Sequence, residues 1–152
     1  MTSPLFKPLK IKSLNLPNRI VMAPMTRSKS PGGVPGEDVA DYYARRAAAD
    51  VGLIVTEGTT VKRGGSSNDP NVPNFYKPEA LAGWKRVVEK VHAVNGLIAP
   101  QLWHQGMMRK PGTGPEPDAP TDSPSGITHS GKQVFDAPTS AEVDDMVMAY
   151  AN

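Results

Sequence analysis

The spacing of hydrophobic and polar residues changes along the chain in a way that predicts alternating strands and helices. Residues 9–16 alternate apolar and polar side chains, which is typical of a short β-hairpin. Three compact apolar runs follow, at residues 19–23, 51–55 and 97–102, and each is too continuous for a strand with one solvated face. These runs therefore predict three buried strands.

Helical spacing predicts a helix after each of these strands. Residues 37–49 open with an acidic turn that complements the helix dipole, and their apolar stripe comprises Val39, Ala40, Tyr43, Ala44 and Ala47. Residues 78–95 begin with a proline and end at Asn-Gly, with a stripe of Leu81, Trp84, Val88 and Val91. The last helix begins at Thr139 with a capping box, and its apolar face comprises Val143, Met146, Val147 and Tyr150. We expect no later part of the chain to cover that face.

Glycine, proline and short polar residues mark the connections between these elements. Residues 27–36 predict one loop, and a second follows the middle strand as far as about residue 75. Residues 104–138, after the third strand, predict a long irregular excursion. Segments of that length without regular structure are usually functional or disordered.

Repeated strand–helix units predict a parallel sheet covered by helices. The chain contains no Gly-x-Gly-x-x-Gly turn after a strand and no Walker phosphate loop, so a nucleotide-binding Rossmann or P-loop site is unsupported. A (β/α)8 barrel needs about 250 residues and eight strands, whereas 152 residues hold three. We therefore expect an α/β fold in which residues 1–152 form the N-terminal part of a TIM barrel, about three βα units plus a hairpin. The complementary C-terminal portion would come from a second polypeptide.

Composition narrows the functional classes. The chain has no cysteine, which excludes disulfides, thiolate metal sites and a cysteine nucleophile. Its 17 basic and 15 acidic residues give a net charge of +2 without a basic stripe, so we expect no nucleic-acid partner. No apolar run approaches the ~20 residues of a membrane span, and the N-terminus lacks a secretory signal. We expect a cytoplasmic protein with neither a membrane nor a metal as a partner.

In a barrel of this kind the active site lies at the carboxyl ends of the strands. Ala23-Pro24-Met25-Thr26 follows the first strand, Glu57-Gly58-Thr59 the second, and Gln101-Leu102-Trp103-His104 closes the third. These segments supply a hydroxyl, a residue without a side chain, a carboxamide and an aromatic wall. They contain no nucleophile paired with a base. The ligand that suits them best is a planar heterocycle whose edge alternates hydrogen-bond donors and acceptors.

Six segments of the chain resemble the Old Yellow Enzyme family of ene-reductases, in family order and spacing. They are Leu5-Phe6-Lys7-Pro8-Leu9, Asn18-Arg19-Ile20-Val21-Met22-Ala23-Pro24-Met25-Thr26-Arg27, Asp41-Tyr42-Tyr43-Ala44-Arg45-Arg46-Ala47, Gly52-Leu53-Ile54-Val55-Thr56-Glu57-Gly58-Thr59, Gly83-Trp84-Lys85 and Gln101-Leu102-Trp103-His104. The resemblance implies bound FMN, which takes hydride from NAD(P)H and passes it to an alkene activated by a carbonyl or nitro group.

The resemblance also implies roles for individual residues. Pro24 and Met25 match positions that pack against the isoalloxazine, and Thr26 matches the hydroxyl that bonds its C4 carbonyl and so tunes the flavin. Gly58 matches a backbone contact to the flavin, and Gln101 the amide that faces the pyrimidine edge. In the resemblance, Trp103 lines the substrate pocket. The family's substrate-anchoring pair, its proton-donating tyrosine and its phosphate-binding residues belong to later strands that these 152 residues do not contain. At positions 68–69, where some relatives have a tyrosine, the chain has Asn-Asp, so no substrate role is assigned there.

Plainer interpretations stay open for the same residues. Thr26 could cap a turn, Gln101 could be a solvated polar residue, and Trp103 could fill the core. His104 is expected to be structural and to bond within the excursion. For the whole chain, the alternatives are a truncated or self-associating half-barrel without activity, and a flavin enzyme acting on RNA. The tRNA dihydrouridine synthases also begin with a strand leading into Ala-Pro-Met, but they use a cysteine that this chain lacks.

Overall fold

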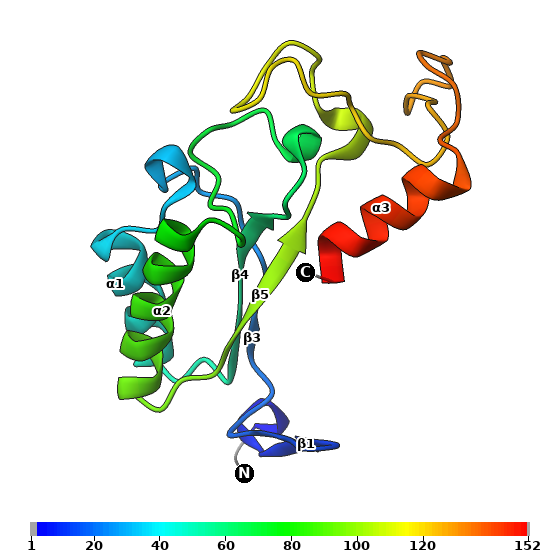
Figure 1. The fold of residues 1–152 in the computed structure, drawn as a ribbon. Helices are drawn as coiled ribbons and strands as arrows, with labels where there is room; N and C mark the ends of the chain where they lie inside the picture. Colours follow the sequence, from blue (N-terminus) through cyan, green and yellow to red (C-terminus); the bar gives the residue numbers. More distant parts are fainter. Residues whose placement is uncertain (1–2, 152) are drawn as a thin grey trace.

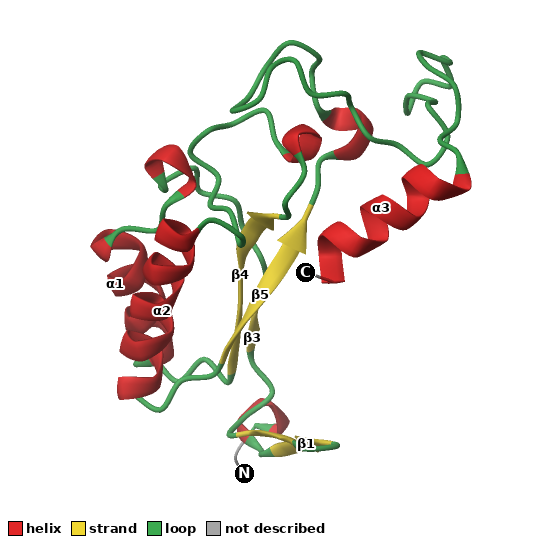
Figure 2. Ribbon diagram, viewed as in Figure 1, coloured by secondary structure: helices red, strands yellow, loops and turns green. Residues whose placement is uncertain are grey.

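The computed structural model describes residues 3–151 of the chain. The strands are β1 (Leu9–Ile11), β2 (Leu14–Leu16), β3 (Val21–Met22), β4 (Leu53–Thr60) and β5 (Ile98–Trp103), and the helices are α1 (Glu37–Ala47), α2 (Pro78–Ala93) and α3 (Ser140–Ala151). Four 3-10 helices of three residues each lie in the connections: η1 (Pro4–Phe6), η2 (Pro31–Gly33), η3 (Gly64–Ser66) and η4 (Gly106–Met108). Figures 1 and 2 show their arrangement.

Strands β3, β4 and β5 form a parallel sheet in that order, with α1 and α2 packed together on one of its faces (Figure 1). The hairpin of β1 and β2 lies at the end of the sheet where the parallel strands begin. This is the predicted start of a (β/α)8 barrel, with each strand followed by its helix. The predicted hairpin, parallel sheet and three helices are confirmed.

The core lies between the two helices and the middle strand. Its largest members, Tyr43, Ile54 and Trp84, are almost wholly buried. The buried stripe of α2 differs from the predicted one, because Leu81 is 42% exposed and the buried positions are Ala80, Gly83, Trp84, Val87 and Val91. The helical period was predicted correctly. Leu81 instead lines an open, mostly apolar hollow together with Val88 of α2 and Pro100 of β5.

The strand bounds also differ from the prediction. The first parallel strand contains only Val21 and Met22, and Val21 is 49% exposed rather than buried. It stands at the sheet edge, and its outer side has no partner strand within the described residues. The middle strand was predicted to end at residue 55 but continues to Thr60, because residues 58–60 pair with β5 and Thr60 also bonds to the loop at residues 73–75.

A β-bulge in β4 explains how a charged residue comes to face the helices. The register runs from Val55 opposite Ala99 to Gly58 opposite Gln101, so β4 holds one extra residue over this stretch. Side chains three apart on a regular strand point to opposite faces. Here Ile54 packs in the core beside Tyr43, and Glu57, three residues later, also bonds to Tyr43. Because of the extra residue, Gly58 lies on the opposite face of the sheet, away from the helices.

Helix α3 stands apart from α1 and α2 (Figure 2). The predicted capping box is present: the Glu142 amide donates to the Thr139 hydroxyl, and the Thr139 amide donates to the Glu142 carboxylate at 2.7 Å. No residue of α3 is buried, and Val147 is 59% exposed. Its apolar face is therefore uncovered within residues 3–151.

Candidate active site at the carboxyl ends of the strands

The residues singled out in the sequence lie at one edge of the sheet. Because parallel strands end at the same edge, the segment after β3, the end of β4 and the end of β5 come together there. Gly58 pairs with Gln101 in the sheet register. The segment of Thr26 reaches the same place, since the next residue, Arg27, bonds to Glu57 in β4. The structure thus brings together all three predicted segments.

Gly58 and Trp103 are in direct contact. A Cβ atom built on Gly58 would lie 2.9 Å from both Cγ and Cδ2 of the Trp103 indole. That separation is closer than side chains approach one another, so the ring occupies the space that any side chain at position 58 would need. Trp103 is half-buried rather than enclosed, which argues against a pure core-filling role.

Gln101 has a fixed backbone and a free side chain. Its amide donates to the Thr56 hydroxyl at 3.2 Å, and its carbonyl accepts from the Thr59 hydroxyl at 2.9 Å. These two side chains bridge the gap that the bulge opens in the ladder. The Gln101 carboxamide forms no hydrogen bond with residues 3–151, so both its donor and its acceptor remain available to a ligand.

Pro24, Met25 and Thr26 form the exposed rim of the site. Met25 is 52% exposed, although it is a large apolar side chain. The Thr26 hydroxyl is exposed and forms no hydrogen bond within the part of the chain that the structure describes. The alternative of Thr26 as a turn cap therefore has no support in the structure.

Glu57 lies just behind this rim and was not among the predicted site residues. Its carboxylate is fully buried and forms an ion pair with Arg27 at 2.9 Å. The Tyr43 hydroxyl accepts from the Glu57 amide at 2.8 Å, and burial raises the pKa of Tyr43 above its ordinary value. A single ionisable residue directly after a buried apolar run was the available signal, since such a residue is rarely buried without a partner.

His104 is structural, as expected, and bonds within the excursion. Its Nδ1 accepts from the Gly106 amide at 2.9 Å, and its Nε2 lies 3.1 Å from Asp122 Oδ2. Burial lowers the pKa of His104, although Asp122 opposes this shift. The imidazole is therefore neutral at pH 7, with its proton on Nε2, because Nδ1 must be free to accept. Arg63 bonds to both oxygens of Asp122 and lowers the pKa of that carboxyl.

The excursion at residues 104–138 is organised around a buried arginine. The Arg109 side chain donates to the carbonyls of Ala119, Thr113 and Glu116 at 2.7–3.1 Å, and the residue is only 2% exposed. A guanidinium matches several acceptors at once because its donors form a rigid fork. Sequence periodicity did not single out Arg109, since a lone arginine in a glycine- and proline-rich loop usually lies in solvent.

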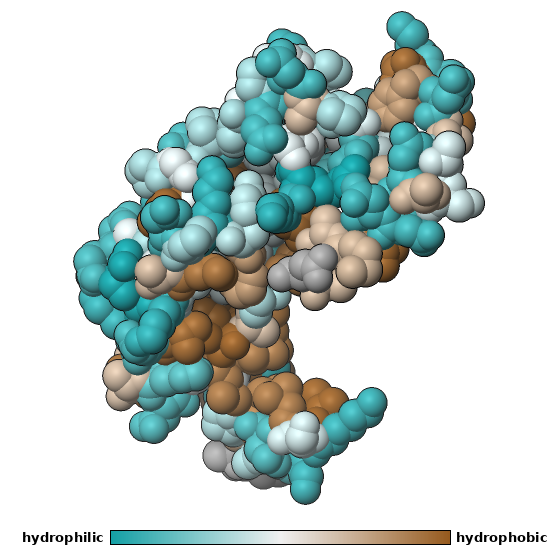
Figure 3. All heavy atoms as spheres, in the orientation of Figure 1, coloured by the Kyte–Doolittle hydropathy of each residue, from teal (hydrophilic) through white to brown (hydrophobic). Residues whose placement is uncertain are grey.

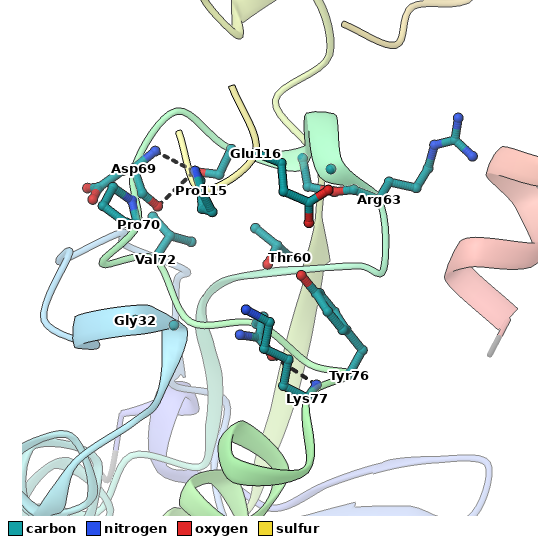
Figure 4. Close-up of a pocket in the computed structure, with 15 residues that line it drawn as sticks. Gly32, Thr60, Arg63, Asp69, Pro70, Val72, Tyr76, Lys77, Pro115 and Glu116 are labelled. Atoms are coloured by element: carbon teal, nitrogen blue, oxygen red, sulfur yellow. Dashed lines mark hydrogen bonds between the residues drawn. The ribbon is translucent and has the colours of Figure 1, made fainter. Parts of the chain in front are cut away.

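A separate cavity of about 120 Å³ lies between the loops that follow β3, β4 and β5 (Figure 4). Tyr76 and Glu116 face each other across it, and burial followed by the Glu116 charge raises the pKa of Tyr76. The Arg63 guanidinium points out of the cavity towards α3, where it pairs with Asp145. None of the predicted site residues lines this cavity, so it is distinct from the strand-end site.

Two broader features concern membranes and metals. None of the helices in residues 3–151 has the length and apolar character needed to cross a bilayer. Over the same residues, no three His, Asp or Glu side chains converge in a way that could hold a metal ion.

Comparison with known proteins agrees with this architecture and decides the family. Residues 4–152 match the model of the NADH:flavin oxidoreductase / NADH oxidase family. The flavin oxidoreductase hxnT of Emericella nidulans is 39% identical over 160 aligned positions, which cover 97% of this chain and 41% of that protein. The chain belongs to the Old Yellow Enzyme family.

Solved structures of this family share the fold. Old Yellow Enzyme from Pichia sp. AKU4542 matches with a TM-score of 0.86 and 29% identity, over 98% of this chain and 41% of that one. Morphinone reductase, solved with tetrahydroNAD, matches with a TM-score of 0.83 and 34% identity, over 98% and 44%. The chain thus spans about two fifths of these relatives and corresponds to the N-terminal part of their TIM barrel.

Proposed function

We propose that this chain is the FMN-binding portion of an NAD(P)H-dependent ene-reductase, which reduces C=C bonds activated by a carbonyl or nitro group. The observation that carries the proposal is the convergence of Thr26, Gly58 and Gln101 at one sheet edge in a member of the Old Yellow Enzyme family. FMN, when bound, would supply the hydride chemistry between the nicotinamide and the alkene. That morphinone reductase has been solved with tetrahydroNAD supports a nicotinamide donor.

The chain's own residues would bind and orient the flavin. The Thr26 hydroxyl would donate to the flavin C4 carbonyl, where negative charge develops on reduction. The Gln101 carboxamide would donate to O2 and accept from N3–H on the pyrimidine edge. Pro24 and Met25 would pack against the ring system, Gly58 would contact it through the backbone, and Trp103 would line the substrate pocket.

Three observations fit these residues to a planar heterocycle. The Thr26 hydroxyl and the Gln101 carboxamide are polar groups without partners in residues 3–151, at the same sheet edge. Met25 presents an exposed apolar surface beside them. The space above Gly58 is taken by the Trp103 indole, which forms a flat aromatic wall. Together these groups offer donors, an acceptor and apolar contact.

The apolar surface that this chain leaves uncovered supports the proposal that further barrel strands pack against it. Figure 3 shows hydrophobic side chains gathered in the concave side of the molecule. A hollow of about 500 Å³ opens there, lined by Leu81 of α2, Leu102 of β5 and Tyr150 of α3 among others. Exposed contiguous apolar surface of this kind marks an interaction site. We propose that the later strands and helices of the barrel cover it, supplied by a second polypeptide.

Activity of the completed barrel tests the proposal. The tagged chain would be purified from the cells that make it, with any associated polypeptide, and NAD(P)H oxidation would be followed with and without a cyclic enone. Enone-dependent oxidation is expected, and Gln101→Ala should lower it while Gln133→Ala, in the exposed excursion, should not. Oxidation that does not depend on an activated alkene would contradict the ene-reductase proposal.

The same open face favours one alternative function. Unpaired strand edges and uncovered apolar helices promote association with another copy. A non-catalytic module would behave as a colourless oligomer of a single polypeptide. The mass of the purified assembly separates the two proposals.

A further inference from the structure

Glu57 is a charged residue held inside the sheet. Its side chain has no exposed surface, and its two oxygens accept four hydrogen bonds. An ionised carboxylate in such a place is stable only when it is paired and fully bonded. Arg27 provides the positive charge, with Nε and Nη2 at 3.0 and 2.9 Å from Oε1.

Arg27 is held by its main chain as well as by its side chain. Its backbone amide donates to the other carboxylate oxygen of Glu57, Oε2, at 3.1 Å. That amide belongs to the planar peptide unit that also contains the carbonyl of Thr26. Glu57 therefore fixes the orientation of the peptide unit that links Thr26 to Arg27.

The opposite side of Glu57 is tied to the helical core. The Tyr43 hydroxyl accepts from the Glu57 amide at 2.8 Å and lies 3.3 Å from Oε1, to which it donates. Tyr43 is completely buried in α1 and packs near Trp84 of α2. The Arg27 guanidinium also lies 3.7 Å from the ring centre of Tyr42 in the same helix. The carboxylate thus connects the rim segment to the buried core between α1, α2 and β4.

Thr26 itself has no comparable restraint. It is exposed, and its side chain makes no hydrogen bond within residues 3–151. Its position therefore depends on its neighbour Arg27.

We propose that Glu57 is a positioning residue for the flavin: through its three hydrogen bonds to Arg27 it holds Thr26 where its hydroxyl can meet the cofactor. The inference rests on the proposed function, since it assumes that Thr26 contacts FMN. Glu57 itself would touch neither cofactor nor substrate. Preorganised donors of this kind need a supporting group that fixes them before the ligand arrives.

A double-mutant cycle on FMN affinity tests this coupling. The dissociation constant of FMN would be measured by fluorescence quenching for the purified assembly and for its Thr26→Ala, Glu57→Gln and doubly substituted variants. Each single substitution should weaken binding roughly five- to tenfold, equivalent to about one hydrogen bond. In the Thr26→Ala background, Glu57→Gln should change the affinity by less than about twofold, because the group it positions is gone. Additive effects would overturn the proposal.

Two further variants separate positioning from general damage. Asp122→Asn removes a largely buried carboxylate, 11% exposed, with a similar two-armed arginine contact, but in a segment without flavin-facing residues. It should leave FMN affinity unchanged, and an equal loss would indicate a merely structural effect of Glu57. Arg27→Lys removes the guanidinium fork but keeps the backbone bond to Oε2, so it should weaken binding less than Glu57→Gln.

Hydrogen exchange on the full chain gives a readout that does not depend on bound flavin. Glu57→Gln should speed exchange of the Arg27 amide, which bonds to Glu57, at least tenfold, while the Ile54 amide, bonded to Leu97, keeps its protection. Unchanged exchange of the Arg27 amide would overturn the positioning role. If the unsubstituted protein binds no FMN, the proposed function fails, and this exchange measurement still decides whether Glu57 orders Thr26. If Ile54 also loses protection, Arg27→Lys replaces Glu57→Gln in the comparison.

Discussion

The indole of Trp103 lies against the Cα of Gly58, so closely that a methyl group on Gly58 would fall 2.9 Å from two ring atoms. The contact joins the ends of β4 and β5, and Gly58 pairs in register with Gln101. The position of the Trp103 indole therefore requires glycine at residue 58, independently of any contact with a ligand.

We expect Gly58→Ala to destabilise the fold, because the added methyl group must push the indole or the strand aside. Overpacking of this kind costs about 1–3 kcal/mol, measurable by urea unfolding. In a Trp103→Leu background, a smaller side chain leaves room for the methyl group, and the loss should shrink. An equal loss in both backgrounds would mean that the indole is not what excludes a side chain at position 58.

The Tyr43 hydroxyl should contribute measurably to stability. Tyr43→Phe leaves the buried Glu57 amide without its acceptor, a loss of about 1–3 kcal/mol in the free energy of unfolding. Tyr42→Phe is the matched control: its ring carries the contact with Arg27, and phenylalanine retains that ring. In chemical denaturation, the free energy of unfolding should be clearly lower for Tyr43→Phe than for Tyr42→Phe. Equal effects would contradict the bonding described for Tyr43.

The pH dependence of stability should contain a contribution from His104. Its folded pKa lies below the ordinary value of 6.5, so the unfolded chain binds the proton more readily than the folded protein. Stability from this group is therefore fully present above pH 6.5 and is lost as the pH falls towards the folded pKa. Protonation would also remove the acceptor at Nδ1 that binds the Gly106 amide.

An NMR titration of the His104 ring measures this shift directly. The midpoint should lie below 6.5, and the Gly106 amide signal should move with the same midpoint. Replacement of Asp122 by Asn removes the group that favours the protonated ring, so the midpoint should fall further. A midpoint above 6.5 in the unsubstituted protein would show that the Asp122 charge outweighs burial.

Arg109 should control the order of residues 110–121. Lysine cannot satisfy the carbonyls of Thr113, Glu116 and Ala119 together. If Arg109→Lys makes local opening easier by about 1.4 kcal/mol, cleavage of this loop by a protease should become about tenfold faster. Arg45→Lys, at an exposed position of α1, should leave the rate unchanged. Equal cleavage rates for both variants would show that Arg109 does not order the loop.

Sequence periodicity predicted the elements well because each has a regular apolar pattern and clear end signals. The capping box of Thr139 and Glu142 set the start of α3, and Pro78 set the start of α2. The pattern could not say which part of a wide apolar face would be covered. Leu81 was therefore expected to be buried, whereas it is exposed on the open side of α2.

The arrangement of the candidate site was only partly predictable. Local motifs indicated Thr26, Gly58 and Gln101, and the rule for parallel strands placed them at one edge. The hydrogen bonds of Glu57 that support this edge were not predictable. The bulge that turns Glu57 towards Tyr43 depends on pairing between β4 and β5. The network of Arg109 likewise forms from carbonyls that converge only in the folded loop. Whether each rim residue meets a flavin stays a prediction.

We propose that the strand-end site of this chain holds FMN once the barrel is complete. The most direct measurement is the visible absorption spectrum of the protein purified from the cells that make it, together with the intact mass of every polypeptide present. We predict a bound-flavin spectrum, and the masses will show whether the remaining strands lie on this polypeptide or on a second one. A colourless sample that contains this chain alone, and that does not quench added FMN, would contradict the account.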